Sequence, residues 1–91
     1  MTLIRKEMRK DSGNLYEYSL YVNKSPRVAS FGLCLYSIKI RLTLENGSVS
    51  EKIVKDIFSE GKRAVSFFDF ILKNLVTPID LPYVIEDALI F

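Results

Sequence analysis

Apolar and polar residues alternate almost without interruption between residues 31 and 44. This period of two is typical of a β-strand with one buried face. The apolar positions are Cys34, Tyr36, Ile38, Ile40, Leu42 and Leu44. Asn46-Gly47 follows directly, and this pair is the strongest short-range signal for a hairpin turn. We expect a long hairpin at the centre of an antiparallel sheet, with residues 49–57 as its second strand.

The apolar pattern also predicts the register of that hairpin. An even-numbered loop pairs Ile40 with Ile53 and keeps the apolar residues of both strands on one face. A register shifted by one residue would place Lys52 and Asp56 on the core side, so we expect the even loop. Residues 49–58 also fit a helical stripe, which leaves a helix open as the alternative.

Two further strands are predicted over residues 2–10 and 15–22, joined by turn-forming Asp11-Ser12-Gly13-Asn14. A three-residue loop pairs Met8 with Tyr18 and keeps the apolar faces together. A two-residue loop would pair Met8 with Glu17 and mix the faces, so we expect the odd loop. The expected inner residues are Ile4, Met8, Tyr16, Tyr18, Leu20 and Val22.

From residue 59 the apolar spacing becomes helical. We expect helices over residues 60–76 and 81–90, with Ser59 and Asp80 as their N-caps. Thr77-Pro78 separates them because the residue before proline avoids helical geometry. The inward stripe of the second helix is Leu81, Val84, Ile85, Ala88 and Leu89.

This order of elements predicts a single α+β domain over residues 1–91. Strands come first and helices last, which is typical of α+β proteins. We expect a four-stranded antiparallel β-meander followed by two C-terminal helices packed on one face.

The composition argues against the common kinds of catalytic and metal-binding site. Histidine is absent, and with it the commonest general base and metal ligand. The four glycines are far apart, so no phosphate-binding loop is present. The single cysteine, Cys34, lies on an apolar strand face and is predicted to be a buried, inert thiol. We expect a protein without enzymatic activity, cofactor or metal.

The same composition predicts a cytoplasmic protein. No apolar run approaches the roughly 18–20 residues that a membrane-spanning helix needs. The N-terminal residues carry charges without the apolar core of a secretory signal. One cysteine cannot form an intramolecular disulfide.

Two surfaces are candidates for binding a partner. Phe70 falls on the polar side of its predicted helix, and the terminal Ile90 and Phe91 are apolar too. A hydrophobic surface of this kind indicates a homo-oligomer or an unknown protein partner, and ordinary close packing is the alternative. We therefore expect a protein–protein interaction or regulatory module, with a homodimer as one form.

The second candidate surface is basic. Residues 1–41 carry a net charge of +5 and residues 42–91 a net charge of −3, which together give the overall +2. The outer sheet face is predicted to present Arg5, Arg9, Lys39, Arg41 and Lys52. Such a stripe would suit nucleic acid, although Glu7 and Glu17 compete on the same side.

The C-terminal part resembles a known family over residues 54–89. The resemblance rests on Asp56-Ile57 at a strand end, Thr77-Pro78 with Leu81, and the helix motif Val84-Ile85-Glu86-Asp87. These features are similar to a family of short uncharacterised proteins, a domain of unknown function, from low-GC Gram-positive, clostridial-type bacteria. The resemblance implies a small cytosolic bacterial domain and assigns no activity.

Overall fold

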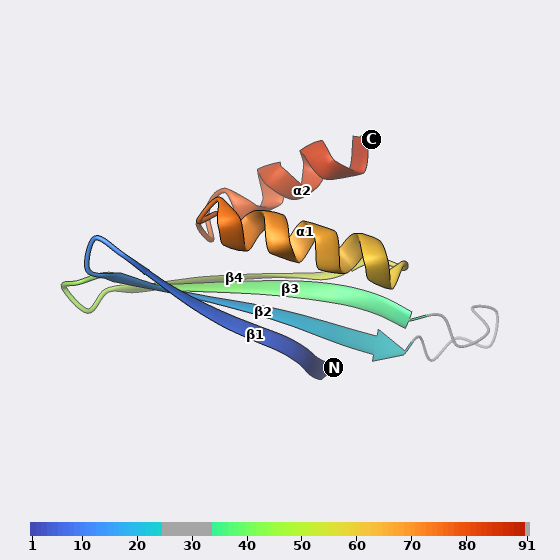
Figure 1. The fold of residues 1–91 in the computed structure, drawn as a ribbon, viewed down its shortest axis with the longest axis horizontal. Helices are drawn as coiled ribbons and strands as arrows, with labels where there is room; N and C mark the ends of the chain where they lie inside the picture. The colour runs from blue at the N-terminus through green and yellow to red at the C-terminus, as the bar shows by residue number, and fades with distance from the viewer. Residues whose placement is uncertain (25–33, 91) are drawn as a thin grey trace.

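The computed structural model describes residues 1–24 and 34–90, and of residue 90 only the backbone. Four strands precede two helices: β1 (Thr2–Asp11), β2 (Asn14–Lys24), β3 (Cys34–Thr43), β4 (Val49–Phe58), α1 (Gly61–Lys73) and α2 (Leu81–Ile90). The strands form one antiparallel sheet in the order β1-β2-β3-β4. Both helices lie on the same face of this sheet (Figure 1). The predicted α+β meander is therefore confirmed, and residues 49–58 form a strand.

The core lies between the central strands and the helices. Tyr18 and Leu20 of β2 and Ile38 and Ile40 of β3 have no exposed surface. Phe68, Ile71 and Leu81 cover them from the helical side and are equally buried. Fully burying an apolar side chain of this size contributes about 1.5–3 kcal/mol. The inner faces predicted for these two strands are confirmed at these positions.

The register predicted for the β1–β2 hairpin is wrong. Met8 lies opposite Glu17 and Asp11 opposite Asn14, so the loop has two residues. Its residues, Ser12 and Gly13, both have positive φ (52° and 83°), as a type I′ turn requires. That turn matches the twist of the flanking strands, and its geometry overrides the apolar pattern of β1. Met8 is consequently exposed, as is Ile4, where β1 is irregular.

The register predicted for the β3–β4 hairpin is also wrong. Thr43 lies opposite Val49 and Ile40 opposite Lys52. The Gly47 amide donates to the Leu44 carbonyl (2.9 Å), and the Leu44 amide donates to the Ser48 carbonyl (2.8 Å). With Gly47 at φ 91°, this is a three-residue loop that ends in a left-handed glycine. Asn46-Gly47 thus forms an odd loop, which turns Lys52 toward the helices.

A bulge in β4 returns the strand to the core. The register changes from Ile38 opposite Val54 to Tyr36 opposite Phe58, which leaves extra residues on β4. Asp56 adopts φ 56° there, and its amide donates to the Ser37 hydroxyl (2.9 Å). The bulge places the buried Phe58, instead of Asp56, opposite Tyr36 and so keeps the core-facing side of β4 apolar beyond Val54.

Several details of the helices and of Cys34 differ from the predictions. Glu60, not Ser59, precedes the first turn of α1, and its side chain makes no capping hydrogen bond. Asp80 does precede α2, but its carboxylate accepts a hydrogen bond from the Thr77 hydroxyl (3.0 Å). Leu89 is half-exposed instead of inward-facing, and Cys34 is only partly buried.

Tyr18 joins the sheet to the segment between the helices. Its hydroxyl donates to the Val76 carbonyl at 3.0 Å, and the phenol is fully buried. Burial raises the pKa of the Tyr18 phenol above its ordinary value of 10.0, and the neighbouring Tyr16 adds to the shift. The neutral hydroxyl is therefore the form that the fold stabilises.

Tyr18→Phe is expected to lower the free energy of unfolding by about 1–3 kcal/mol, because the buried Val76 carbonyl loses its donor. Urea unfolding followed by circular dichroism measures this loss. Tyr21→Phe, which removes the hydroxyl of a tyrosine on the opposite face of β2, is the matched control and should change stability little.

The raised Tyr18 pKa also predicts how stability depends on pH. The pKa of Tyr18 is higher in the folded state than in the unfolded state. Its contribution to the free energy of unfolding is therefore complete below about pH 10 and decreases progressively as the pH rises above that value. Above pH 10, wild type should lose up to about 1.4 kcal/mol more per pH unit than Tyr18→Phe. Parallel urea titrations at pH 8 to 11 compare the two, and identical alkaline profiles would contradict the prediction.

Candidate functional site

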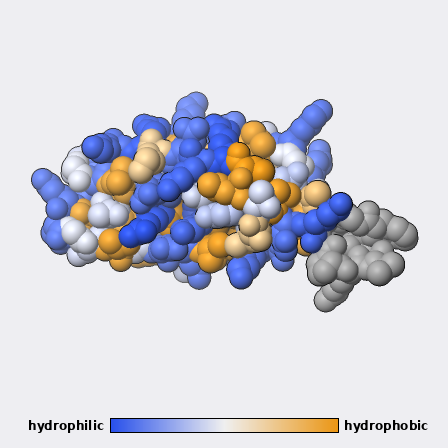
Figure 2. Space-filling model, turned by 90° about the horizontal axis from the view of Figure 1, so that it is seen from below, coloured by the Kyte–Doolittle hydropathy of each residue, from blue (hydrophilic) through white to orange (hydrophobic). Residues whose placement is uncertain are grey.

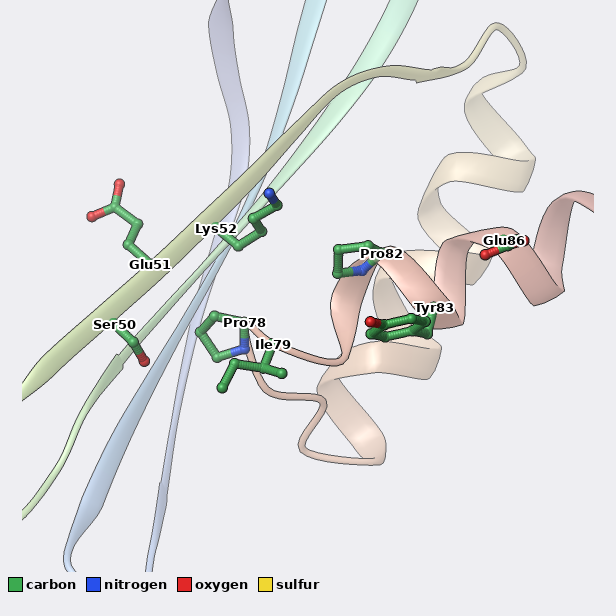
Figure 3. Close-up of a pocket in the computed structure, with 8 residues that line it drawn as sticks. All are labelled: Ser50, Glu51, Lys52, Pro78, Ile79, Pro82, Tyr83 and Glu86. Atoms are coloured by element: carbon green, nitrogen blue, oxygen red, sulfur yellow. The ribbon is translucent and has the colours of Figure 1, made fainter.

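An open groove lies between the edge strand β4 and the start of α2 (Figure 3). Its volume is about 430 Å³. One wall is β4, and the other comes from the α1–α2 connection and the first turns of α2. The lining residues are Ser50, Glu51, Lys52, Pro78, Ile79, Pro82, Tyr83 and Glu86. Segments that are nearly thirty positions apart in the sequence thus meet at one sheet edge.

The apolar wall of the groove is unusually exposed. Ile79 is 76% and Tyr83 67% exposed, the highest values for large apolar side chains in the described part of the chain. Both follow Pro78, which is itself buried and places the connection against the sheet. The Thr77 hydroxyl bond to Asp80 fixes the turn that leads into α2. The local chain geometry therefore presents these two side chains to solvent.

The other wall offers main-chain hydrogen-bonding groups. Among residues 1–24 and 34–90, β4 is the last strand of the sheet, so no described strand lies along one of its sides. Positions that bond to the neighbouring strand alternate with positions that do not along an antiparallel ladder, and the Leu44 amide donates to the Ser48 carbonyl. Ser50 and Lys52 consequently bond toward β3. The amides and carbonyls of Glu51 and Ile53 point to the free edge.

The opposite edge of the sheet is less suitable for pairing. Six of the ten residues of β1 are charged, and the strand is irregular near Ile4. Charges and bulges are the features that discourage strand pairing at an edge. In β4 the straight segment of residues 49–54 contains only two charged residues.

Lys52 gives the groove its charge. Its side chain extends from β4 toward Pro82, whereas Glu51 points away from α2 (Figure 3). Lys52 had been predicted for the outer basic face, and its pairing opposite the buried Ile40 places it on the helical side instead. The groove therefore combines apolar surface, a strand edge, the Lys52 ammonium group on β4 and the Glu86 carboxylate on α2.

The structure also separates the other residues of the predicted basic face. Arg5 lies on the helical side, where its Nη1 is 2.7 Å from the Asp69 carboxylate and its guanidinium covers the Phe68 ring. Arg9 donates from Nη1 to the Leu72 carbonyl (3.1 Å). The prediction of a common outer face is wrong for these two arginines. They hold α1 against the sheet.

Lys39 and Arg41 do lie on the open sheet face, as predicted, but beside carboxylates. Lys39 Nζ is 3.1 Å from Glu51, and Arg41 Nε is 3.9 Å from Glu17. Lys6 approaches the same Glu17 at 3.5 Å. Figure 2 shows this face, where hydrophilic and hydrophobic side chains are interleaved. It forms a mixed surface of both charge signs.

A second apolar groove of about 420 Å³ lies between the two helices, lined by Phe67, Phe70, Val84, Asp87 and Ala88. Phe70 is 50% exposed and stacks on Phe67, with ring centroids 6.4 Å apart. Phe70 is thus exposed as its helical position predicted. The side chain of Ile90 and the whole of Phe91, which were predicted to share this surface, lie outside the described residues.

The groove at β4 was not predicted from the sequence. One signal was available: Tyr83 lies between Leu81 and Val84, off the inward stripe of its helix. The exposure of Ile79 gave no such signal, because it depends on how the connection crosses the sheet edge. In residues 1–24 and 34–90, no group of three or more Cys, Asp or Glu side chains could hold a metal ion. No helix in these ranges is long and apolar enough to cross a membrane.

The fold and the groove define a small α+β domain with helices on one sheet face and one strand edge open beside them. The chain belongs to DUF6514, described as a family of unknown function, whose model matches residues 1–90. The family match therefore covers the N-terminal strands as well as the C-terminal segment that carried the resemblance. Searches of curated proteins and of solved structures gave no match.

Proline substitutions test which main-chain groups face the free edge. Glu51→Pro removes an amide that points away from β3, whereas Lys52→Pro removes one that bonds to it. Both wild-type side chains are exposed, so the two variants are well matched. Lys52→Pro should lose about 1–3 kcal/mol more in free energy of unfolding than Glu51→Pro. Equal losses in urea titrations would contradict this orientation of β4.

Proposed function

We propose that this chain is a non-enzymatic protein–protein interaction module that binds an extended segment along the free edge of β4. One observation carries the proposal: in the part of the chain that the structure describes, β4 is an edge strand, and its Glu51 and Ile53 lie beside a groove walled by exposed Ile79 and Tyr83. Strand addition at such an edge is a recurring mode of peptide recognition.

The strand edge, the groove and the charged side chains would contribute to binding in different ways. The amides and carbonyls of β4 would bond to the incoming backbone and supply affinity without regard to sequence. Alternate side chains of that segment would point to the helical side, into the groove between β4 and α2. Covering Ile79 or Tyr83 there would contribute up to about 1.5–3 kcal/mol each. Lys52 favours an acidic or carbonyl group close to β4, whereas Glu86 favours a basic or donor group close to α2.

Two other functions have weaker support. Nucleic-acid binding needs contiguous basic surface, and Lys39 and Arg41 lie beside carboxylates while Arg5 and Arg9 contact α1. The groove at Phe70 is apolar but offers no open strand edge. The proposal places the module in the cytoplasm of a low-GC Gram-positive bacterium, as the resemblance of residues 54–89 implies.

A library of random, surface-displayed heptapeptides tests this function. Peptides that bind the full chain are selected from it. Selected peptides should bind wild type and lose at least about tenfold in affinity on Tyr83→Asp, since a carboxylate replaces the apolar wall. Phe70→Asp is the matched control: the same change at the other groove should leave binding within about threefold. Fluorescence anisotropy with labelled peptides measures both variants, and their circular dichroism spectra establish that they fold.

Amide chemical shifts then locate the peptide. Changes centred on Glu51 and Ile53 are expected. Peptides whose affinity depends on Phe70 but not on Tyr83 would overturn the proposed site. Selection of no peptide at all would count against the module as proposed.

A further inference from the structure

We infer that the segment bound by β4 is β4 of a second copy of this chain, paired antiparallel about a two-fold axis at Ile53. This inference rests on the proposed function and names its partner. It follows from three properties of residues 51–55. These are which residues direct their amides and carbonyls to the free edge, on which face of the sheet each side chain lies, and the order of the charges along the strand.

The hydrogen-bonding phase permits a symmetric pair. Glu51 and Ile53 alternate with residues that bond to β3, so their main-chain groups recur along the free edge. Val54 is the last regularly paired residue of β4 before the bulge, and Lys55 follows it directly, ahead of the left-handed Asp56. A two-fold axis perpendicular to the sheet keeps the helices of both copies on one side. Paired residues then share a face, as they do within the sheet.

The charges select one centre among the possible ones. If the axis passed through Glu51, that residue would lie opposite the partner's Glu51. If the axis passed through Lys52, two lysines would lie opposite each other. Like charges directly opposite each other destabilise a sheet. Centring the axis on Ile53 pairs two isoleucines and places each Glu51 opposite the partner's Lys55. The sequence Glu51-Lys52-Ile53-Val54-Lys55 is therefore electrostatically self-complementary in this register.

The surrounding structure is compatible with this pairing. Glu51 already lies 3.1 Å from Lys39 on the open face, so the partner's Lys55 would join an existing charge cluster. On the helical side, Lys52 would lie opposite the partner's Val54, beside the groove that Ile79 and Tyr83 border. The two four-stranded sheets would become one sheet of eight strands, with all four helices on one face.

Charge reversal tests the register. Glu51→Lys and Lys55→Glu each place like charges opposite each other twice per dimer, so each should raise the dimer dissociation constant at least about tenfold. The double variant Glu51→Lys/Lys55→Glu restores opposite charges and should return to within about threefold of wild type. Asp11→Lys, a reversal at the exposed end of β1 on the other edge of the sheet, controls for net charge. Sedimentation equilibrium at 50 and 300 mM salt measures all five chains.

A disulfide test locates the axis independently. In a Cys34→Ser background, Ile53→Cys places two thiols opposite each other at about 5.5 Å between Cα atoms, within the range for a disulfide. Mild oxidation should link most of that chain into dimers. Val49→Cys, also on the free edge, would have no cysteine opposite it and should remain largely unlinked.

The outcomes separate this inference from the function it rests on. If the chain is a monomer at all concentrations but still binds selected peptides at β4, the inferred pairing with a second copy is overturned. The proposed peptide-binding function is then still supported. A monomer that binds none would count against both. A dimer that neither reversal weakens, or that Phe70→Asp dissociates, would overturn the β4 pairing. Loss on each single reversal with recovery in the double variant supports it.

Discussion

The hydrogen bond from the Tyr18 hydroxyl to the Val76 carbonyl is the contact on which the layered arrangement depends. It joins the middle of the sheet to the short segment between the helices and satisfies the buried Val76 carbonyl there. Arg5 and Arg9 add bonds from β1 to α1, at Asp69 and at the Leu72 carbonyl. Together they fix the direction in which the chain leaves α1, and hence where α2 begins relative to β4.

The sequence was sufficient to predict the class of fold because apolar periodicity is a strong signal. The period of two in β2 and β3 and the helical spacing after residue 59 specify both the elements and their buried faces. Register was predicted wrongly in both hairpins because turn geometry decided it. Ser12-Gly13 forms a tight turn of two left-handed residues, and Asn46-Gly47 forms part of an odd loop. A shift of one residue moved Arg5, Arg9 and Lys52 to the helical side.

The candidate site was harder to predict than the fold. Phe70 could be found because a single helix determines its direction, and its exposure agrees with that reasoning. The groove at β4 depends on where the α1–α2 connection crosses the sheet edge, which local sequence does not specify. Ile79 and Tyr83 gain their significance only from the neighbouring strand. Residues that act together across long sequence separations need the tertiary structure to be recognised.

The unequal edges of the sheet limit how far any assembly could grow. Charged, irregular β1 resists pairing, and the left-handed Asp56 ends the straight part of β4 after a few residues. A sheet with two open edges can add copies indefinitely and become a fibre. A sheet with only one usable edge is saturated as soon as that edge is filled. Assembly through β4 would therefore stop at two copies, because β1 offers no second usable edge.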